Sequence, residues 1–488
     1  MGREFGMGRG ALAVVTAVGL AAGAARGESA AKPGAGPAIH GSVVAPPAWL
    51  PPGAPFDVAK HLAPPPAASN AAPLYLEAFR EFLPLSGVDF PGGPLSDAAV
   101  QAVRGRRNRI QSLYDAHAKG GAPAAAVDAL VDECGPGLKK LAEAQKRDRC
   151  NFSPALGPVA LEIAPDAFGV VHVLALKANR DLGRGRPDSA VADLAAVLRL
   201  SRDLRRRGST IAQILAGRME SVAAREIAAP ILAVRGLKPG VYDELIKTFK
   251  MHEAAAVDPW TETVQEETLT ILATARALSA DFQTLRSELG VDSNMRPGDV
   301  LAKLAGSDVA ASDVAAMNAR FEGWRPADDQ ALVAILYPWC KARLDPSARS
   351  YSARLRLAKA PIDRGADGDP ALKAFLAESA LPLEGALKAS TRSAAEVRAV
   401  ACLTALRRWR ATKNGAPASL EAAVKAAGMS ATPLDPFNDR PMRMANLGGA
   451  VVVYSVGEDL KDDGGRVISA RLGQPGDIVF ALDAPARR

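Results

Sequence analysis

Apolar residues recur at helical spacing in an alanine-rich background through the middle of this 488-residue chain, from about residue 70 to residue 390. Aromatic residues make up only 5% of the chain, although 48% of it is hydrophobic. Such a composition favours helices that pack closely through small side chains over a sheet-rich enzyme. We therefore expect a mostly α fold with a multi-helical body.

The clearest helical hairpin is predicted at residues 168–205. Val171, Leu174 and Leu182 fall on one helical face, residues 183–187 break the chain, and the apolar spacing then continues to Leu204. This pair resembles a tetratricopeptide-like hairpin, but no second copy follows at a fixed period, so a solenoid is not predicted. A first helix is expected just after Asn70, a suitable N-cap, and further helices fit residues 211–234, 241–252, 261–278 and 371–387.

The first 27 residues have the pattern of an export signal. Arg3 and Arg9 precede an apolar run from Ala11 to Ala25, and Ala25 and Gly27 place small residues at the two positions that a signal peptidase reads. The run is short for a membrane anchor, which needs roughly 20 apolar residues, so cleavage is favoured over anchoring. No later segment predicts a stable membrane span. We expect an exported protein, located in the periplasm, outside the cell or at the envelope.

Residues 28–69 are rich in proline and alanine and predict a semi-rigid linker, because proline lacks a backbone donor and favours extended chain. His40 and His61 lie in this linker and are not expected to be ligands. We predict four parts: the signal at 1–27, the linker at 28–69, a helical domain at 70–390 and a C-terminal module at 391–488.

The net charge of +7 comes partly from two arginine clusters, one around Arg106 and one formed by residues 202–207. Neither cluster is interleaved with aromatic residues that stack on bases, so nucleic acid is not an expected partner. Solvated helix faces or contacts with a surface polymer are the expected roles. The remaining partner classes are an unknown protein, a peptide or an envelope polymer.

Four cysteines do not make a disulfide framework in a chain of this length. Cys134 and Cys150 could pair only if the predicted helix between them lets the chain double back, and the sequence leaves this pairing open. Cys402 lies among apolar residues and is predicted to be a core residue.

Common catalytic signatures are absent. His252-Glu253 lacks the second histidine of a zinc protease, and His172 is predicted to be a packing histidine. Glu262, Glu266 and Glu267 have helical spacing, for which a solvated helix face is the favoured interpretation. An exported hydrolase that uses carboxylates such as Glu262 and Glu266 is the alternative.

The chain changes character after about residue 390. A helix at 394–411 is followed by short β-type runs at 441–444, 450–454 and 478–482, which predict a small α+β module. Asp459, Asp462 and Asp463 lie close together after the second run and would repel one another unless they are solvated, paired or bridged by a cation. Calcium accepts such carboxylates in loose geometry, but an acidic turn in water is the simpler alternative.

The order of motifs at residues 394–483 resembles the globular part of the major pseudopilin of type II secretion systems. The matching motifs are a helix, Gly415 to Leu420, the turn Asp435-Pro436-Phe437, and a hairpin ending in Ser455-Val456-Gly457 before the aspartates. Phe437 and Asn438 depart from the usual tryptophan and glycine. The resemblance implies calcium bound by Asp459, Asp462 and Asp463.

The N-terminal part departs from a pseudopilin, because a conventional signal and a long helical body replace the leader and continuous apolar helix. A filament subunit is therefore not expected. The whole chain is similar to uncharacterised secreted bacterial families. We expect a non-enzymatic binding or scaffold protein of the cell envelope, with an exported hydrolase or a secretion-system accessory protein as alternatives.

Overall fold

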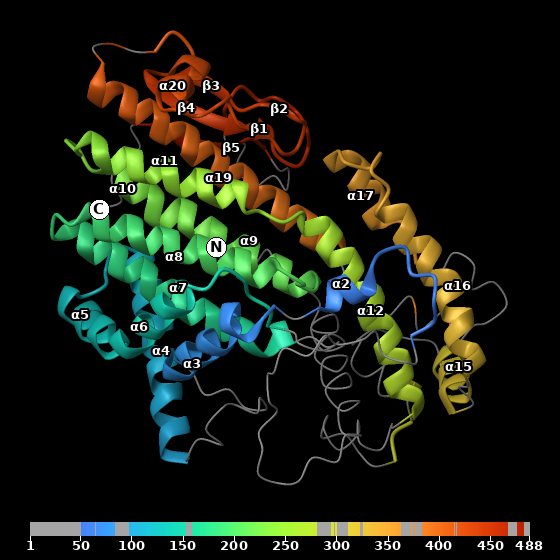
Figure 1. The fold of residues 1–488 in the computed structure, drawn as a ribbon. Helices are drawn as coiled ribbons and strands as arrows, with labels where there is room; N and C mark the ends of the chain where they lie inside the picture. Colours follow the sequence, from blue (N-terminus) through green and yellow to red (C-terminus); the bar gives the residue numbers. More distant parts are fainter. Residues whose placement is uncertain are drawn as a thin grey trace.

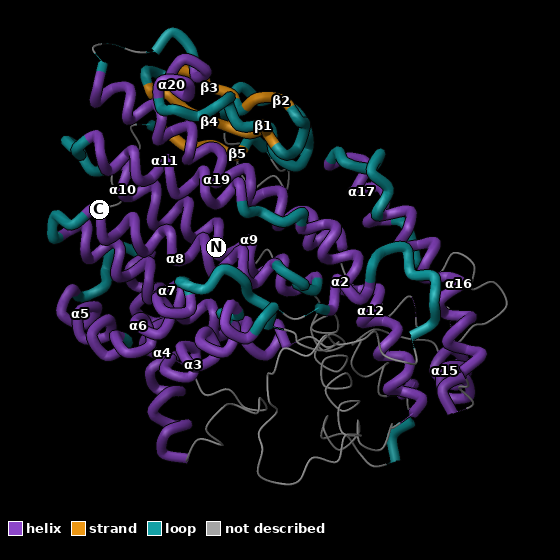
Figure 2. Tube along the Cα trace, viewed as in Figure 1, coloured by secondary structure: helices purple, strands orange, loops and turns teal. Residues whose placement is uncertain are grey.

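The computed structural model describes residues 50–63, 65–82, 97–152, 159–280, 294–296, 298–299, 311–322, 326–362, 372, 376, 383–413, 415, 417–466 and 476–482. The signal at 1–27, residues 28–49 of the expected linker, His40 and most of the helix expected at 371–387 lie outside these residues. The described chain is mostly α-helical with a small C-terminal sheet region, as predicted (Figures 1 and 2).

The N-terminal half of the helical body is formed by α2 (Val58–Leu62), the 3₁₀ turn η1 (Ala67–Ser69), α3 (Ala72–Phe82), α4 (Asp97–Ala118), α5 (Ala124–Glu133), α6 (Gly135–Ala144), α7 (Val159–Gly183) and α8 (Pro187–Arg205). The helical body continues through α9 (Thr210–Val222), the π-helical turn η2 (Ala223–Ala228), α10 (Ala229–Ala233), α11 (Pro239–Ala254), α12 (Pro259–Ala280), α15 (Ala311–Glu322), α16 (Pro326–Arg343) and α17 (Tyr351–Lys359). The predicted helices at 211–234, 241–252 and 261–278 are confirmed within a few residues.

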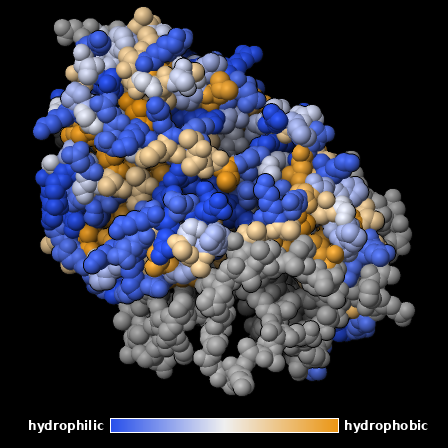
Figure 3. All heavy atoms as spheres, in the orientation of Figure 1, coloured by the Kyte–Doolittle hydropathy of each residue, from blue (hydrophilic) through white to orange (hydrophobic). Residues whose placement is uncertain are grey.

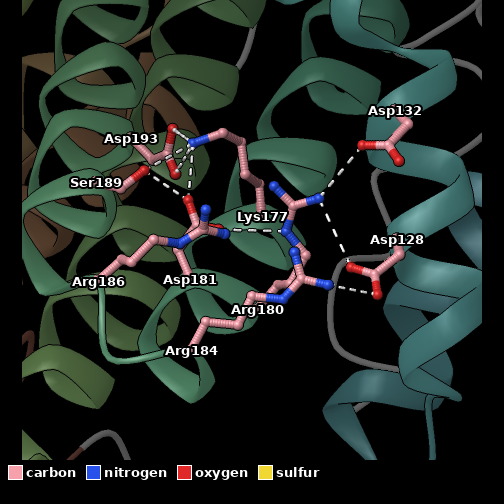
Figure 4. A network of polar contacts seen from close by, with 9 residues as sticks. All are labelled: Asp128, Asp132, Lys177, Arg180, Asp181, Arg184, Arg186, Ser189 and Asp193. Atoms are coloured by element: carbon pink, nitrogen blue, oxygen red, sulfur yellow. Dashed lines mark hydrogen bonds and ion pairs between the residues drawn. The ribbon is translucent and has the colours of Figure 1, made fainter.

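The predicted hairpin is formed by α7 and α8, which pack against each other. Figure 4 shows the charged network that ties their ends together. The Lys177 ammonium lies 2.9 Å from both oxygens of Asp193 and 3.2 Å from Asp181. Burial would raise the pKa of Asp181, but hydrogen bonds from Ser189 and Lys177 outweigh it and lower the pKa to about 2. The network therefore holds the turn in one geometry.

The centre of the molecule is the long helix α19 (Leu383–Thr412), which packs on α9, α11 and α17. Gly217 of α9 allows the closest approach, because a Cβ at this position would lie 2.9 Å from the carbonyl oxygen of Ala389. Cys402 lies in this core and is fully buried, as predicted. Among the described residues, all four cysteines are free thiols, so the structure contains no Cys134–Cys150 bridge.

The C-terminal region follows α19 with α20 (Leu420–Ala426) and two small antiparallel sheets, drawn in red at the top of Figure 1. One sheet pairs β1 (Leu434–Asp435) with β2 (Arg440–Pro441), and the other has the order β3 (Arg443–Leu447), β4 (Ala450–Ser455), β5 (Ile478–Ala481). Asp435 joins the two sheets, since its buried carboxylate accepts hydrogen bonds from Ser455 Oγ at 2.8 Å and Val456 N at 2.9 Å.

The predicted boundary after residue 390 falls inside α19. This helix also packs on β4 and β5, and one hydrophobic cluster contains Leu387 and Val397 together with Val424 and Val453. The helical body and the C-terminal sheets therefore share a core.

The prediction of a linker is wrong for residues 50–63 and 65–69, which pack on the body. Val58 and Leu62 of α2 form a small hydrophobic cluster with Leu269 and Ala273 of α12. The Tyr337 hydroxyl donates to the carbonyl oxygen of Pro51 at 2.7 Å. The segment is therefore folded despite its prolines, because the apolar residues between them are buried against distant helices.

The face drawn in Figure 3 carries mainly hydrophilic side chains over its described part, with hydrophobic ones in separate small groups. None of the described helices combines the length and hydrophobicity needed to cross a membrane.

Candidate ligand groove

A cavity of about 450 Å³ opens where α8, α11, α12, α17 and α19 meet the turn between β1 and β2. A second cavity of about 430 Å³ adjoins it and shares four of its lining residues: Asp258, Trp260, Arg349 and Arg354. We call the two cavities together the groove. Its volume is in the range of ordinary ligand sites.

Trp260 and Tyr351 form much of the apolar wall of the groove and are 4% and 2% exposed. The Trp260 indole donates to the carbonyl oxygen of Arg343 at 2.7 Å, which fixes its ring. Tyr351 packs edge-on against Phe437 of the C-terminal turn, with ring centroids 4.8 Å apart. The Tyr351 hydroxyl is buried and has no hydrogen-bond partner in the described part of the chain.

Burial first, and then the charges of Glu458 and Glu384, raise the pKa of Tyr351 well above its ordinary value. The hydroxyl therefore stays protonated and can donate a hydrogen bond. A buried hydroxyl without a partner costs free energy, so Tyr351 is a candidate contact for a ligand.

Glu220 of α9 is the buried centre beneath the groove. It forms an ion pair with Arg205 at 2.6 Å and accepts a hydrogen bond from Ser393 at 2.7 Å. Burial would raise the pKa of Glu220, but the charge of Arg205 and the hydrogen bonds from Arg205 and Ser393 outweigh it and lower the pKa to about 2. The carboxylate is therefore charged and fully engaged.

His252 of α11 lines the groove and is 7% exposed. Its Nε2 lies 3.5 Å from the carboxylate of Glu220, whereas Nδ1 is buried without a partner among the described residues. Burial lowers the pKa of His252 more than Glu220 raises it. The neutral ring with its proton on Nε2, toward Glu220, leaves Nδ1 free to accept a hydrogen bond.

Five arginines in addition to Arg205 line the groove, and they differ in their partners. Arg343 donates to the carbonyl oxygens of Leu357 and Ala360. Arg354 makes a bidentate pair with Asp258 at 2.8 and 2.9 Å, and Arg398 pairs with Glu253. Arg202 donates to the carbonyl oxygen of Met251 at 2.8 Å and has no acidic partner in the described ranges. Arg349 is exposed, and no described residue pairs with its guanidinium. The two guanidiniums without an acidic partner favour a ligand that carries a carboxylate or another anionic group.

The sequence did not predict this groove. In the sequence, His252 belongs only to an incomplete zinc motif, and the arginines at residues 202–207 are predicted to be solvated. That expectation is wrong for Arg205 and Arg207, which are 4% and 8% exposed.

The three glutamates of α12 are also placed differently from the favoured interpretation. Glu266 and Glu267 are each 2% exposed, so a solvated face is wrong for them. Glu266 accepts a hydrogen bond from His61 at 2.9 Å and lies 3.6 Å from Arg207. Burial raises the pKa of Glu266, but Arg207 and His61 outweigh it and hold the pKa below its ordinary value.

Glu262 accepts the backbone N–H of Arg207 at 2.8 Å, and Glu267 accepts that of Thr210 at 2.6 Å. These carboxylates fix the turn after α8. Glu262 and Glu266 therefore have structural partners, and this arrangement does not favour the hydrolase alternative.

Asp459, Asp462 and Asp463 lie in the loop after β4, as expected from the sequence. Asp462 accepts from the Tyr454 hydroxyl at 3.1 Å and pairs with Arg443 at 3.2 Å, while Asp459 accepts the backbone N–H of Lys461 at 3.1 Å. Within the described residues, no group of three or more histidine, cysteine, aspartate or glutamate side chains is placed to hold a metal ion.

Two features of this loop nevertheless fit a cation. Asp463 has one buried oxygen without a hydrogen-bond partner among the described residues. Asp477, which the sequence analysis missed, is 5% exposed and accepts the backbone N–H groups of Gly465 and Asp463 at 2.7 and 3.4 Å. Burial, together with the charges of Asp463 and Asp462, raises the pKa of Asp477. A cation would relieve this repulsion.

In comparisons with known proteins, no family model, no curated protein and no solved structure matches this chain.

Proposed function

We propose that this chain is an exported, non-enzymatic binding or scaffold protein of the cell envelope, and that the groove holds an extended peptide segment with an acidic side chain. An apolar wall under a charged rim suits a peptide, since a peptide carries both kinds of side chain. The observation that carries the proposal is the pair of buried polar groups without partners in the described structure, Tyr351 Oη and His252 Nδ1, which belong to two lining residues of one open groove.

In this proposal each group has a role. Tyr351 donates to a peptide carbonyl, His252 accepts from a peptide N–H, and Arg349 pairs with the acidic side chain. Buried polar groups select their ligand strongly, because a ligand without the complementary group leaves them unpaired. The carboxylates of Glu220 and Glu266 already have ion-pair and hydrogen-bond partners within the protein, which supports binding over hydrolysis.

The aspartate loop has a supporting role in this proposal. Calcium bound near Asp459, Asp462 and Asp463 would stabilise the C-terminal region, on which Phe437 and the groove wall depend. The unpartnered oxygen of Asp463 and the raised pKa of Asp477 support this part.

Selection from a random heptapeptide display library on the immobilised full-length protein tests the binding function. We expect enriched peptides with an acidic residue, whose affinity falls about tenfold in Arg349→Ala. Arg356→Ala, at an exposed arginine of the following helix α17, is the matched control, because Arg356 is outside the groove lining. Enrichment of no sequence, or equal binding by Arg349→Ala and wild type, would contradict the proposal.

A further inference from the structure

A separate cavity of about 510 Å³ lies between α2, the end of α8, the start of α12 and the segment around Cys150. It shares only Val257 with the groove lining. We call it the basic cavity. None of the roles proposed above uses it.

Cationic side chains outnumber acidic ones in the lining of the basic cavity. The cationic residues are Lys60, Arg149, Arg206 and Arg207, and the acidic residues are Asp57 and Glu262. Both carboxylates are already engaged by backbone donors. Asp57 accepts the N–H of Lys60 at 2.9 Å and caps α2, and Glu262 accepts the N–H of Arg207 at 2.8 Å.

Of the four cations, Arg207 lies 3.6 Å from the carboxylate of Glu266. Lys60, Arg149 and Arg206 have no acidic partner in the part of the chain that the structure describes. The Nε of Arg206 is moreover buried without a hydrogen-bond partner among those residues. Burial, and then the charges of Arg199 and Arg206, lower the pKa of the neighbouring Arg202. Crowded guanidinium groups of this kind create a positive potential that attracts anions.

The backbone holds these cations in place. Arg207 has a φ of 52°, a left-handed conformation that is unusual for a residue with a side chain. Its N–H is bound by Glu262, and its guanidinium lies 3.6 Å from Glu266. Such backbone strain persists only where surrounding contacts enforce it, and it is frequent at binding sites. The turn therefore presents Arg206 at the cavity in a fixed geometry.

We infer that the basic cavity binds a small polyanion with at least two negative oxygen-bearing groups, of the phosphate or polycarboxylate type. Its volume suits a small molecule. Lysine and arginine together form charge-assisted hydrogen bonds with such groups. The inference is independent of the proposed peptide binding, because the two sites share no charged residue.

Isothermal titration of the full-length protein with pyrophosphate and with citrate, at constant ionic strength, tests the inference. We expect at least one of them to bind with a Kd below about 1 mM, and the tighter one identifies the source of the anionic groups. Sodium chloride at the same ionic strength controls for screening.

The variants Lys60→Ala and Arg206→Ala should each weaken this binding about tenfold. Lys413→Ala, which removes an exposed lysine outside the cavity, should leave it unchanged. The melting temperatures of the variants without anion verify that they are folded. Absence of binding by both anions, or equal affinities in wild type, Lys60→Ala and Arg206→Ala, would overturn the inference.

Discussion

We predict that the titration of Glu267 makes the folded protein measurably less stable as the pH rises. Its side chain is buried on α12, and only Oε1 has a hydrogen-bond partner in the described structure, the backbone N–H of Thr210. Burial raises the pKa of Glu267 from 4.5 to about 7, with the hydrogen bond from Thr210 opposing and the charge of Glu266 adding to the shift.

The sign and size of this change in the free energy of unfolding follow from proton linkage. The folded state binds the proton of Glu267 more tightly than the unfolded state, so its contribution is fully present below pH 4.5 and is lost as the pH rises through 7. At 1.36 kcal/mol for each pH unit between the two pKa values, the loss amounts to about 3 kcal/mol.

Glu267→Gln removes this titration and keeps an oxygen for the Thr210 N–H. Urea unfolding of wild type and variant between pH 4.5 and 8 measures the difference in their free energies of unfolding. We expect this difference to change by about 3 kcal/mol in favour of the variant over that range. Glu421→Gln, at an exposed glutamate of α20, controls for the loss of one negative charge. A difference between Glu267→Gln and wild type that does not change with pH would refute the reasoning.

Three further predictions concern stability and thiol chemistry. Lys177→Met should lower the free energy of unfolding by about 3 kcal/mol at pH 7, because it leaves buried Asp193 without its ammonium partner. The loss should shrink at pH 5, because the pKa of Asp193 is raised to about 6. The control variant Lys140→Met, whose ion pairs are exposed, should cost less than about 1 kcal/mol. Equal losses for the two variants in urea titrations would contradict this prediction. Calcium should raise the melting temperature of the full-length protein relative to a chelator, and Asp463→Asn should remove the difference; identical wild-type curves would exclude the calcium proposal. Thiol titration in denaturant without reductant should find four free cysteines, and a count of two would contradict the unpaired Cys134 and Cys150.

The sequence was sufficient for the helices from α7 to α12, because these depend on local apolar spacing, but not for α2, which lies in the segment expected to be a linker. The hairpin of α7 and α8 follows from apolar residues three and four positions apart, and the C-terminal strands from β-branched runs between turns. These patterns require no knowledge of distant partners.

The buried polar groups could not be predicted in the same way. Glu266 is buried because His61, 205 residues earlier in the chain, folds over it. A charged stripe on an isolated helix gives no sign of such a cover. The groove likewise joins His252, Tyr351 and the turn at Pro436, and each of these residues alone has an ordinary interpretation. A signal that could have been weighed is Arg206-Arg207-Gly208, where charged residues occupy a tight turn after a helix.

The affinity of a selected acidic peptide for Tyr351→Phe tests the central claim most directly. The change removes only a buried hydroxyl that has no partner in the described structure, so the melting temperature of the free protein should not fall. If the hydroxyl donates to the peptide, fluorescence polarisation should show an affinity about tenfold below that of wild type, a loss of about 1.4 kcal/mol. Equal affinities of the two proteins for the peptide would contradict the assignment of this groove as the binding site.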